Sequence, residues 1–186
     1  MKKSILTAVV ILAAGVFAAQ AQTSGDVTVN INLHKFQTLT VNHANANINF
    51  ETQDDYTNGA TSGMLDNHLT VSSTGAFVVK ATAVAPELNT ATNKELGLAA
   101  DPLRVSAQAG TTNALTAATY ASNTALITDN SIVSSTKGQF NKNVSVEYKA
   151  DQGVFQNLGL INGDYVSNDH AVTTYKVQVT YTISVN

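Results

Sequence analysis

The sequence predicts an all-β fold in which short antiparallel strands form a sandwich or a barrel. Apolar and polar residues alternate through most of the chain, as expected of strands with one buried face. Charged residues make up only 12% of the chain. Threonine and valine, which favour strands, and asparagine and glycine, which favour turns, take their place. Pairs of turn-forming residues separate the alternating segments, and no segment has the period of a long amphipathic helix.

The strongest alternation lies at the C-terminal end, where apolar residues occupy every second position from Tyr175 to Val185. Near the other end, Asp26–Leu33 places four apolar residues on one face and Thr28, Asn30 and Asn32 on the other. The remaining predicted strands are shorter: Phe36 to Val41, Asn47–Glu51, His68–Ser72, Ala76–Ala83, Leu103–Ala107 and Asn141–Tyr148.

Turn signals divide these segments. Ala83–Asp101 has no clean alternation and is predicted to be a surface excursion, with one short helical turn within Thr90–Ala100. Leu115–Ala125 is rich in alanine and threonine and fits a short helix, a strand or a loop. Turns are predicted at Asn58-Gly59, Ser62-Gly63, Asp66-Asn67, Thr74-Gly75, Ala109-Gly110, Lys137-Gly138 and Asn162-Gly163-Asp164.

Residues 1–21 have the organisation of a secretory signal peptide. Two lysines precede an apolar run, and Ala19-Gln20-Ala21 predicts cleavage between Ala21 and Gln22. We therefore expect an exported protein that crosses the periplasm and works at the cell surface or outside the cell. Residues 22–186 are predicted to form a single β-sandwich domain. Within it, residues 22–34 are either its first strand or a strand donated to a neighbour.

The composition argues against several classes of partner. Without Lys2 and Lys3 the chain has eight basic and thirteen acidic residues, a net charge of −5. Nucleic acid and anionic lipid both require basic surfaces, so neither is an expected ligand. No apolar segment after the signal is long enough to span a membrane. The chain has no cysteine, so its stability must come from apolar burial and strand pairing without disulfides.

We predict no catalytic, cofactor-binding or metal site. The four histidines, His34, His43, His68 and His170, lack the close spacing of zinc ligands. No serine lies in the Gly-x-Ser-x-Gly turn of many hydrolases, and no glycine-rich phosphate loop is present. The paired carboxylates that glycoside hydrolysis requires have no local signature in the sequence. An enzyme is therefore the least favoured class, and no cofactor is expected.

Two further groups of residues fit either a ligand site or ordinary structure. The acidic and amide residues of Gln53-Asp54-Asp55, Asp66-Asn67 and Asn162 to Asp169 could supply oxygen ligands to calcium, but they lack the alternate spacing of a calcium loop and are typical of turns. Tyr56, Tyr120 and Tyr165 lie near turns, where they could stack on sugars or pack within the domain.

The two ends of the mature chain carry the main functional hypothesis. A strand at a free terminus can pair within its own sheet, or it can leave and pair with the open edge of a neighbour. Main-chain hydrogen bonds then supply affinity, and alternate side chains fill a groove. Val27, Val29, Ile31 and Leu33 have the residue type and spacing that such strand exchange requires.

The order of these features resembles secreted single-domain β-sandwich proteins of Bacteroidota-type bacteria, which act as surface or fimbrial subunits. The resemblance rests on Phe50 to Gly59, His68 to Ser73, Ala76 to Ala81 and Thr174 to Ser184. It implies an immunoglobulin-like antiparallel β-sandwich of roughly eight to ten strands. A weaker resemblance is to the WxL domains of Gram-positive surface proteins, with Tyr181-Thr182-Ile183 in the place of Trp-x-Leu. That likeness would imply binding to peptidoglycan.

Two functions therefore stay open. In the first, the protein is a fimbria or filament subunit that assembles with itself or with related subunits through a terminal strand, with the help of a secretion or assembly chaperone. In the second, it is a monomeric surface or periplasmic module that binds glycan or cell wall.

Overall fold

The computed structural model describes residues 24–87, 103–126, 129–152 and 176–186. The chain divides into two units, Met1–His34 and Lys35–Asn186. The described part of the first unit, residues 24–34, has no helix or strand. The second unit carries all the regular structure described below.

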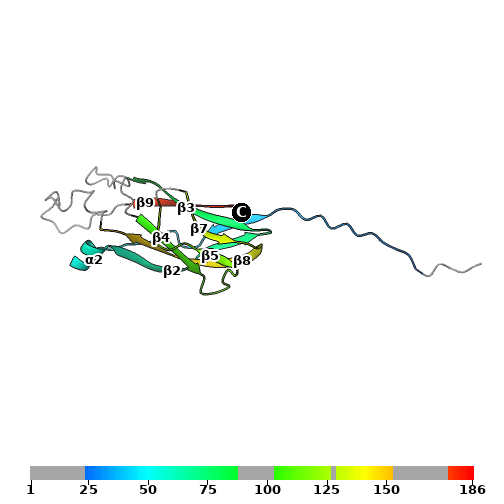
Figure 1. Ribbon diagram of the computed structural model, residues 1–186, viewed down its shortest axis with the longest axis horizontal. Helices are drawn as coiled ribbons and strands as arrows, with labels where there is room; N and C mark the ends of the chain where they lie inside the picture. Colours follow the sequence, from blue (N-terminus) through cyan, green and yellow to red (C-terminus); the bar gives the residue numbers. More distant parts are fainter. Residues whose placement is uncertain (1–23, 88–102, 127–128, 153–175) are drawn as a thin grey trace, which may run out of the picture. The chain divides into compact units, whose positions relative to one another are not determined.

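The Lys35–Asn186 unit is made of two antiparallel sheets, which confirms the predicted all-β sandwich (Figure 1). The larger sheet contains, in spatial order, β1 (Gln37–Val41), β2 (Ala60–Ser73), β8 (Gln139–Ala150), β4 (Leu103–Ala109) and β6 (Thr124–Ala125). The smaller sheet contains β5 (Ala118–Tyr120), β7 (Asn130–Ser135), β3 (Phe77–Glu87) and β9 (Lys176–Val185).

The core lies between the sheets and is built by the alternation seen in the sequence. Along β3 and β9, every second described side chain is the more buried one, as the two-residue period of a strand requires. Among the described residues, Phe77 of β3 is the largest side chain that is completely buried. The core members are Leu69, Val71, Phe77, Val79, Ala81, Val105, Ala107, Leu115, Leu126, Ile132, Val133, Val144, Val146 and Tyr148.

Two turns carry the chain from one sheet to the other. Residues 74–76 connect β2 to β3, and residues 136–138 connect β7 to β8. The two turns touch, because a Cβ atom on Gly138 would lie 2.5 Å from the Thr74 carbonyl oxygen. Only glycine fits this contact without displacing backbone. The predicted turns at Thr74-Gly75 and Lys137-Gly138 therefore join the two layers.

Strand β2 is much longer than the predicted strand His68–Ser72, and the turns expected at Ser62-Gly63 and Asp66-Asn67 lie inside it. Its pairing with β8 shifts register between Thr61 and Met64 and again between Leu65 and Leu69. Gly63 and Asn67 have positive φ angles of 68° and 53°. Turn-forming residues here produce bulges that bend a continuous strand.

The segment before β2 also differs from the prediction. Asn47–Glu51 is not a strand, and it is followed by a short helix, α2 (Gln53–Asn58). Thr52 and Asp55 form a capping box: the Thr52 hydroxyl accepts from the Asp55 amide, and the Asp55 carboxylate accepts from the Thr52 amide at 2.7 Å. These hydrogen bonds satisfy the free amides at the start of the helix.

The predicted strands Ala76–Ala83, Leu103–Ala107 and Asn141–Tyr148 are confirmed as the longer strands β3, β4 and β8. Phe36 to Val41 and the C-terminal strand are confirmed as β1 and β9, each beginning one residue later than predicted. One strand was missed. Leu115–Ala125 contains the short strands β5 and β6 and no helix. Strand β7 escaped prediction because its two apolar residues, Ile132 and Val133, are adjacent in the sequence and both buried. Ala21, Gln22, Thr90–Ala100, most of Ala83–Asp101 and the turn at Asn162-Gly163-Asp164 lie outside the described residues.

Candidate functional site

The described N-terminal segment exposes every apolar residue that the sequence singled out. Val27, Val29, Ile31 and Leu33 are 86%, 76%, 78% and 90% exposed. The predicted strand Asp26–Leu33 is not paired as a strand in the described chain. Four regularly spaced aliphatic side chains in water are unfavourable, since burying each would release about 1.5–3 kcal/mol. This segment has the alternation of a strand with one buried face, but in the described chain it pairs with no sheet.

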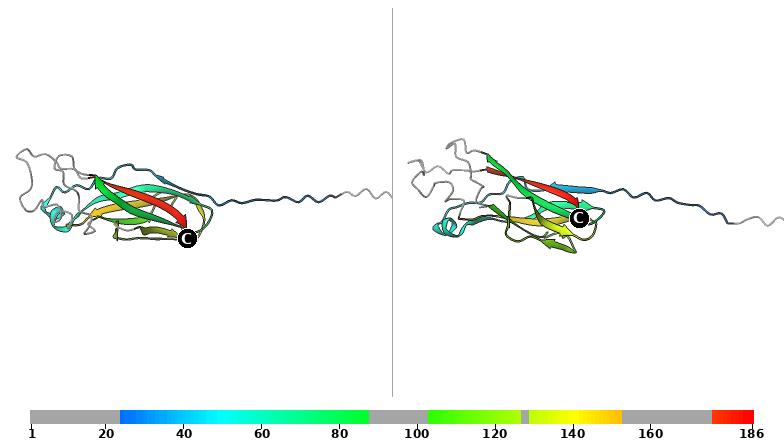
Figure 2. Two further views of the ribbon diagram at one scale, coloured as in Figure 1. Left: turned by 90° about the horizontal axis from the view of Figure 1, so that it is seen from above. Right: turned by 45° about the horizontal axis from the view of Figure 1, so that its top comes forward.

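Strand β9 forms one edge of the smaller sheet and β1 one edge of the larger sheet. These two edge strands contact each other, but among the described residues no ladder pairs them. Figure 2 shows β9 in red beside β3, with which it forms an antiparallel ladder. In the part of the chain that the structure describes, the main-chain groups on the outer side of β9 have no strand partner.

The core is incompletely covered along this side. On β9, Val179, Tyr181 and Ile183 pack against the core but are only partly buried, and Leu39 of β1 is in the same state. The alternate residues of β9 are exposed. An additional strand beside β9 could therefore cover apolar surface as well as satisfy main-chain groups.

A pocket marks one end of this side of the sandwich. It lies where β1 begins and β9 ends, next to the turn that connects β2 to β3. Phe36, which lines the pocket, is 49% exposed and stacks on Phe140 with ring centroids 6.4 Å apart. The lining residues are Lys35, Phe36, Gln37, Ser73, Thr74, Gly75, Ala76 and Val185.

A polar cluster lies inside the sandwich close to the same edge. His68 of β2 is 3% exposed, and its Nε2 atom lies 3.3 Å from the hydroxyl oxygen of Tyr148 on β8. The Tyr148 hydroxyl is in turn hydrogen-bonded to the hydroxyl of Tyr181 on β9. Burial raises the pKa of Tyr181, and the neighbouring Tyr148 raises it further. Burial also raises the pKa of Tyr148, so both phenols are neutral hydrogen-bonding groups at physiological pH.

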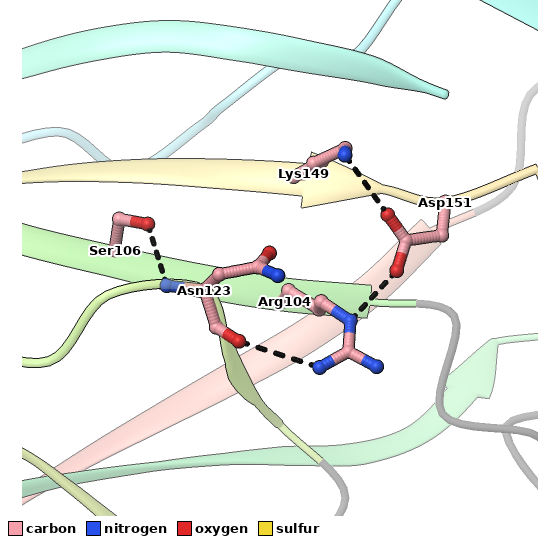
Figure 3. Close-up of polar contacts among 5 residues, drawn as sticks. All are labelled: Arg104, Ser106, Asn123, Lys149 and Asp151. Atoms are coloured by element: carbon pink, nitrogen blue, oxygen red, sulfur yellow. Dashed lines mark hydrogen bonds and ion pairs between the residues drawn. The ribbon is translucent and has the colours of Figure 1, made fainter. Parts of the chain in front are cut away.

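A second polar cluster joins the ends of β4 and β8 (Figure 3). Asp151 accepts from Arg104 Nε at 2.7 Å and pairs with Lys149 at 3.2 Å. Burial raises the pKa of Asp151, but hydrogen bonds from Arg104 and Lys149 outweigh it and lower the pKa overall. Arg104 also donates to the Asn123 carbonyl oxygen, and the Asn123 amide donates to Ser106. Each charge faces a partner, so the cluster fits a structural role.

The histidines are spread over the chain. His34 belongs to the N-terminal unit, and His170 lies outside the described residues. The His43 and His68 rings are stacked with centroids 5.7 Å apart. Within the described ranges, no three His, Asp or Glu side chains gather as a metal site would require.

The acidic and tyrosine candidates have structural contacts. Asp55 caps α2, and hydrogen bonds from Thr52 and then Glu51 lower its pKa. Asp54 accepts from Asn58 at 2.6 Å. Tyr56 donates to the Phe50 carbonyl oxygen at 3.3 Å, and Tyr120 to the Leu115 carbonyl oxygen at 3.0 Å. Tyr165 and the cluster from Asn162 to Asp169 lie outside the described residues.

No protein-family model and no curated protein sequence matches this chain. In the described part of the chain, no helix is both long enough and apolar enough to cross a membrane. The exposed N-terminal segment and the open edge at β9 are the features of this chain that bear most directly on its function.

Proposed function

We propose that the protein is an exported structural subunit of a cell-surface fibre, such as a fimbria or pilus. The segment of residues 22–34 of one copy becomes a strand in the sandwich of the next copy. The observation that carries this proposal is the set of four alternating aliphatic side chains, Val27, Val29, Ile31 and Leu33, all at least 76% exposed. If the segment packed within its own copy, these four side chains would be expected to be buried.

Strand β9 is the edge best suited to accept the segment. It has ten residues, whereas β1, β5 and β6 have five, three and two. Among the described edge strands, only β9 is as long as the eight-residue segment Asp26–Leu33. An antiparallel arrangement is expected, because antiparallel pairing is slightly more stable per residue and both sheets of the sandwich are antiparallel throughout.

The side chains complement each other in this arrangement. A donated strand would direct its aliphatic residues towards the partly buried Val179, Tyr181 and Ile183, and its Thr28, Asn30 and Asn32 towards water. Burying the four aliphatic side chains would release up to ~6–12 kcal/mol, before the cost of ordering the segment and fixing two copies together is subtracted. Main-chain hydrogen bonds to β9 would add to this apolar contribution.

The exposed segment and the open strand edge would need protection during export. A free apolar segment and an open strand edge would aggregate before export was complete. We therefore expect an assembly chaperone to cover one of them in the periplasm, and copies of this chain or related subunits to replace it at the surface. A surface rich in threonine and asparagine, and poor in charge, is suited to close packing of identical subunits.

Truncation tests the proposal. The chain lacking residues 22–34 keeps all described strands, so we expect it to fold but to form no multimers. A synthetic peptide of residues 22–34 should bind it with 1:1 stoichiometry, and a peptide with Val29 and Ile31 replaced by aspartate should not. Light scattering behind a sizing column and calorimetric titration measure these outcomes.

Continued polymerisation of the truncated chain would exclude the segment as the assembly element. A full-length chain that stays monomeric at high concentration, in the presence of its native secretion machinery, and binds glycan or peptidoglycan saturably would instead support the binding-module function.

A further inference from the structure

The buried polar cluster connects the two sheets directly. His68 and Tyr148 belong to the larger sheet, and Tyr181 belongs to β9 in the smaller one. The rings also pack edge to face: His68 lies 6.0 Å from Tyr148 and 5.7 Å from Tyr181, measured between centroids. Because β9 is an edge strand paired only with β3 among the described strands, this contact is an important attachment of β9 to the opposite sheet.

One atom of the cluster is left without a partner. His68 Nδ1 is buried and has no hydrogen-bond partner in the described structure. In a neutral imidazole that nitrogen can remain an unprotonated acceptor while Nε2–H donates to Tyr148. A protonated imidazole has N–H groups on both nitrogens, so it would place an unsatisfied donor and a buried positive charge at this point.

We propose that His68, Tyr148 and Tyr181 form an acid-sensitive latch that holds β9 against the larger sheet while His68 is neutral and releases it when His68 is protonated. The groups that the described residues place against His68 are the His43 ring from the segment after β1, Tyr148 from β8 and Tyr181 from β9. None of these is a carboxylate that could stabilise the imidazolium.

The direction of the pH effect follows from linkage. Burial, and then the nearby His43, lower the pKa of His68 from 6.5 to about 4. When β9 is released or unfolded, His68 regains its ordinary pKa and therefore binds its proton at a higher pH than in the latched form. The latch is therefore fully effective above pH 6.5 and weakens as the pH falls towards 4.

This device acts on β9 in a single copy and does not require fibres. If the proposed function holds, the same strand is the acceptor edge, and acid would then weaken subunit contacts by loosening it. That last consequence alone rests on the proposed function.

Amide hydrogen exchange on the monomer fraction of the full chain tests the latch. After correction for the intrinsic exchange rate, protection of residues 177–185 should fall roughly 10- to 100-fold between pH 7 and pH 4.5. Protection of the central strand β8 should fall less. NMR titration of the His68 ring should give a midpoint near pH 4, at the acid end of the range in which β9 loses protection.

His68→Gln removes the titrating group and should reduce the change in β9 to less than about threefold. Exposed His34→Gln, in the N-terminal unit, is the matched control and should leave the change intact. If His68→Gln does not fold, Tyr181→Phe is the second test. It keeps the ring but removes the hydroxyl that is hydrogen-bonded to Tyr148, so β9 protection should already be low at pH 7. Equal acid effects in β8 and β9, or a His68 that titrates near its ordinary pKa, would overturn the latch. None of these results bears on fibre assembly at neutral pH, which the truncation and the peptide test separately.

Discussion

A chain in which Val29 and Ile31 are both replaced by aspartate is expected to fold normally and to remain monomeric. The two side chains are 76% and 78% exposed, so their replacement removes no intramolecular packing. On a donated strand the same positions would face the core of the neighbour, where an unpaired carboxylate costs several kcal/mol. Two such charges exceed what the rest of the segment could supply. Sizing with light scattering and thermal melting measure assembly and fold separately.

The matched control places the same two charges on the opposite side of the segment. Thr28→Asp together with Asn30→Asp adds an identical net charge, at positions that a donated strand would turn towards water. This variant should still assemble. If both pairs of substitutions reduced assembly equally, charge repulsion rather than strand burial would explain the effect, and the assignment of the inward face would be wrong.

Phe77→Ala is expected to destabilise the sandwich by about 3–5 kcal/mol. Phe77 is completely buried at the start of β3, in a core that has no disulfide to limit the unfolded chain. Removing its ring loses the transfer free energy and leaves a cavity that the surrounding strands can close only in part. Denaturant unfolding of the monomer fraction, followed by circular dichroism, gives the change in free energy.

Phe140→Ala is the control for this prediction. Phe140 is 55% exposed and stacks on Phe36 at the surface, so its loss should cost less than about 1 kcal/mol. Equal effects of the two substitutions would mean that the core does not lie between the sheets as described.

Most of the fold could be predicted from the sequence because alternation reports a strand with one buried face. This holds best for β9, where the pattern runs without interruption to Val185. It fails for β7, whose adjacent Ile132 and Val133 are both buried, and for α2, where Thr52 and Asp55 satisfy local amides. The capping pattern Thr-x-x-Asp was present in the sequence and could have predicted the start of the helix.

The candidate site was predictable only in part. Val27, Val29, Ile31 and Leu33 can be found from their spacing alone. The acceptor edge cannot, because strand order depends on which distant segments pair, and the sequence does not contain that information locally. The same holds for His68, whose neighbours Tyr148 and Tyr181 lie far along the chain and meet it only when the two sheets pack.

The most direct measurement of subunit contact uses the absence of native cysteine. One copy would carry Asn30→Cys and a second copy, distinguished by mass, would carry Thr180→Cys, Thr182→Cys or Ser184→Cys on β9. All four positions are exposed in the single chain. Neighbouring strands bring such residues within the ~4.4–6.8 Å between Cα atoms that a disulfide requires. Thr119→Cys on the opposite edge, β5, serves as the control.

If the N-terminal strand is donated to β9, mild oxidation of the mixed fibres gives a mixed-copy disulfide with at least one β9 position and none with position 119. Disulfides that form equally with β5, or with none of the β9 positions in fibres that have assembled, would contradict donation of the N-terminal strand to β9.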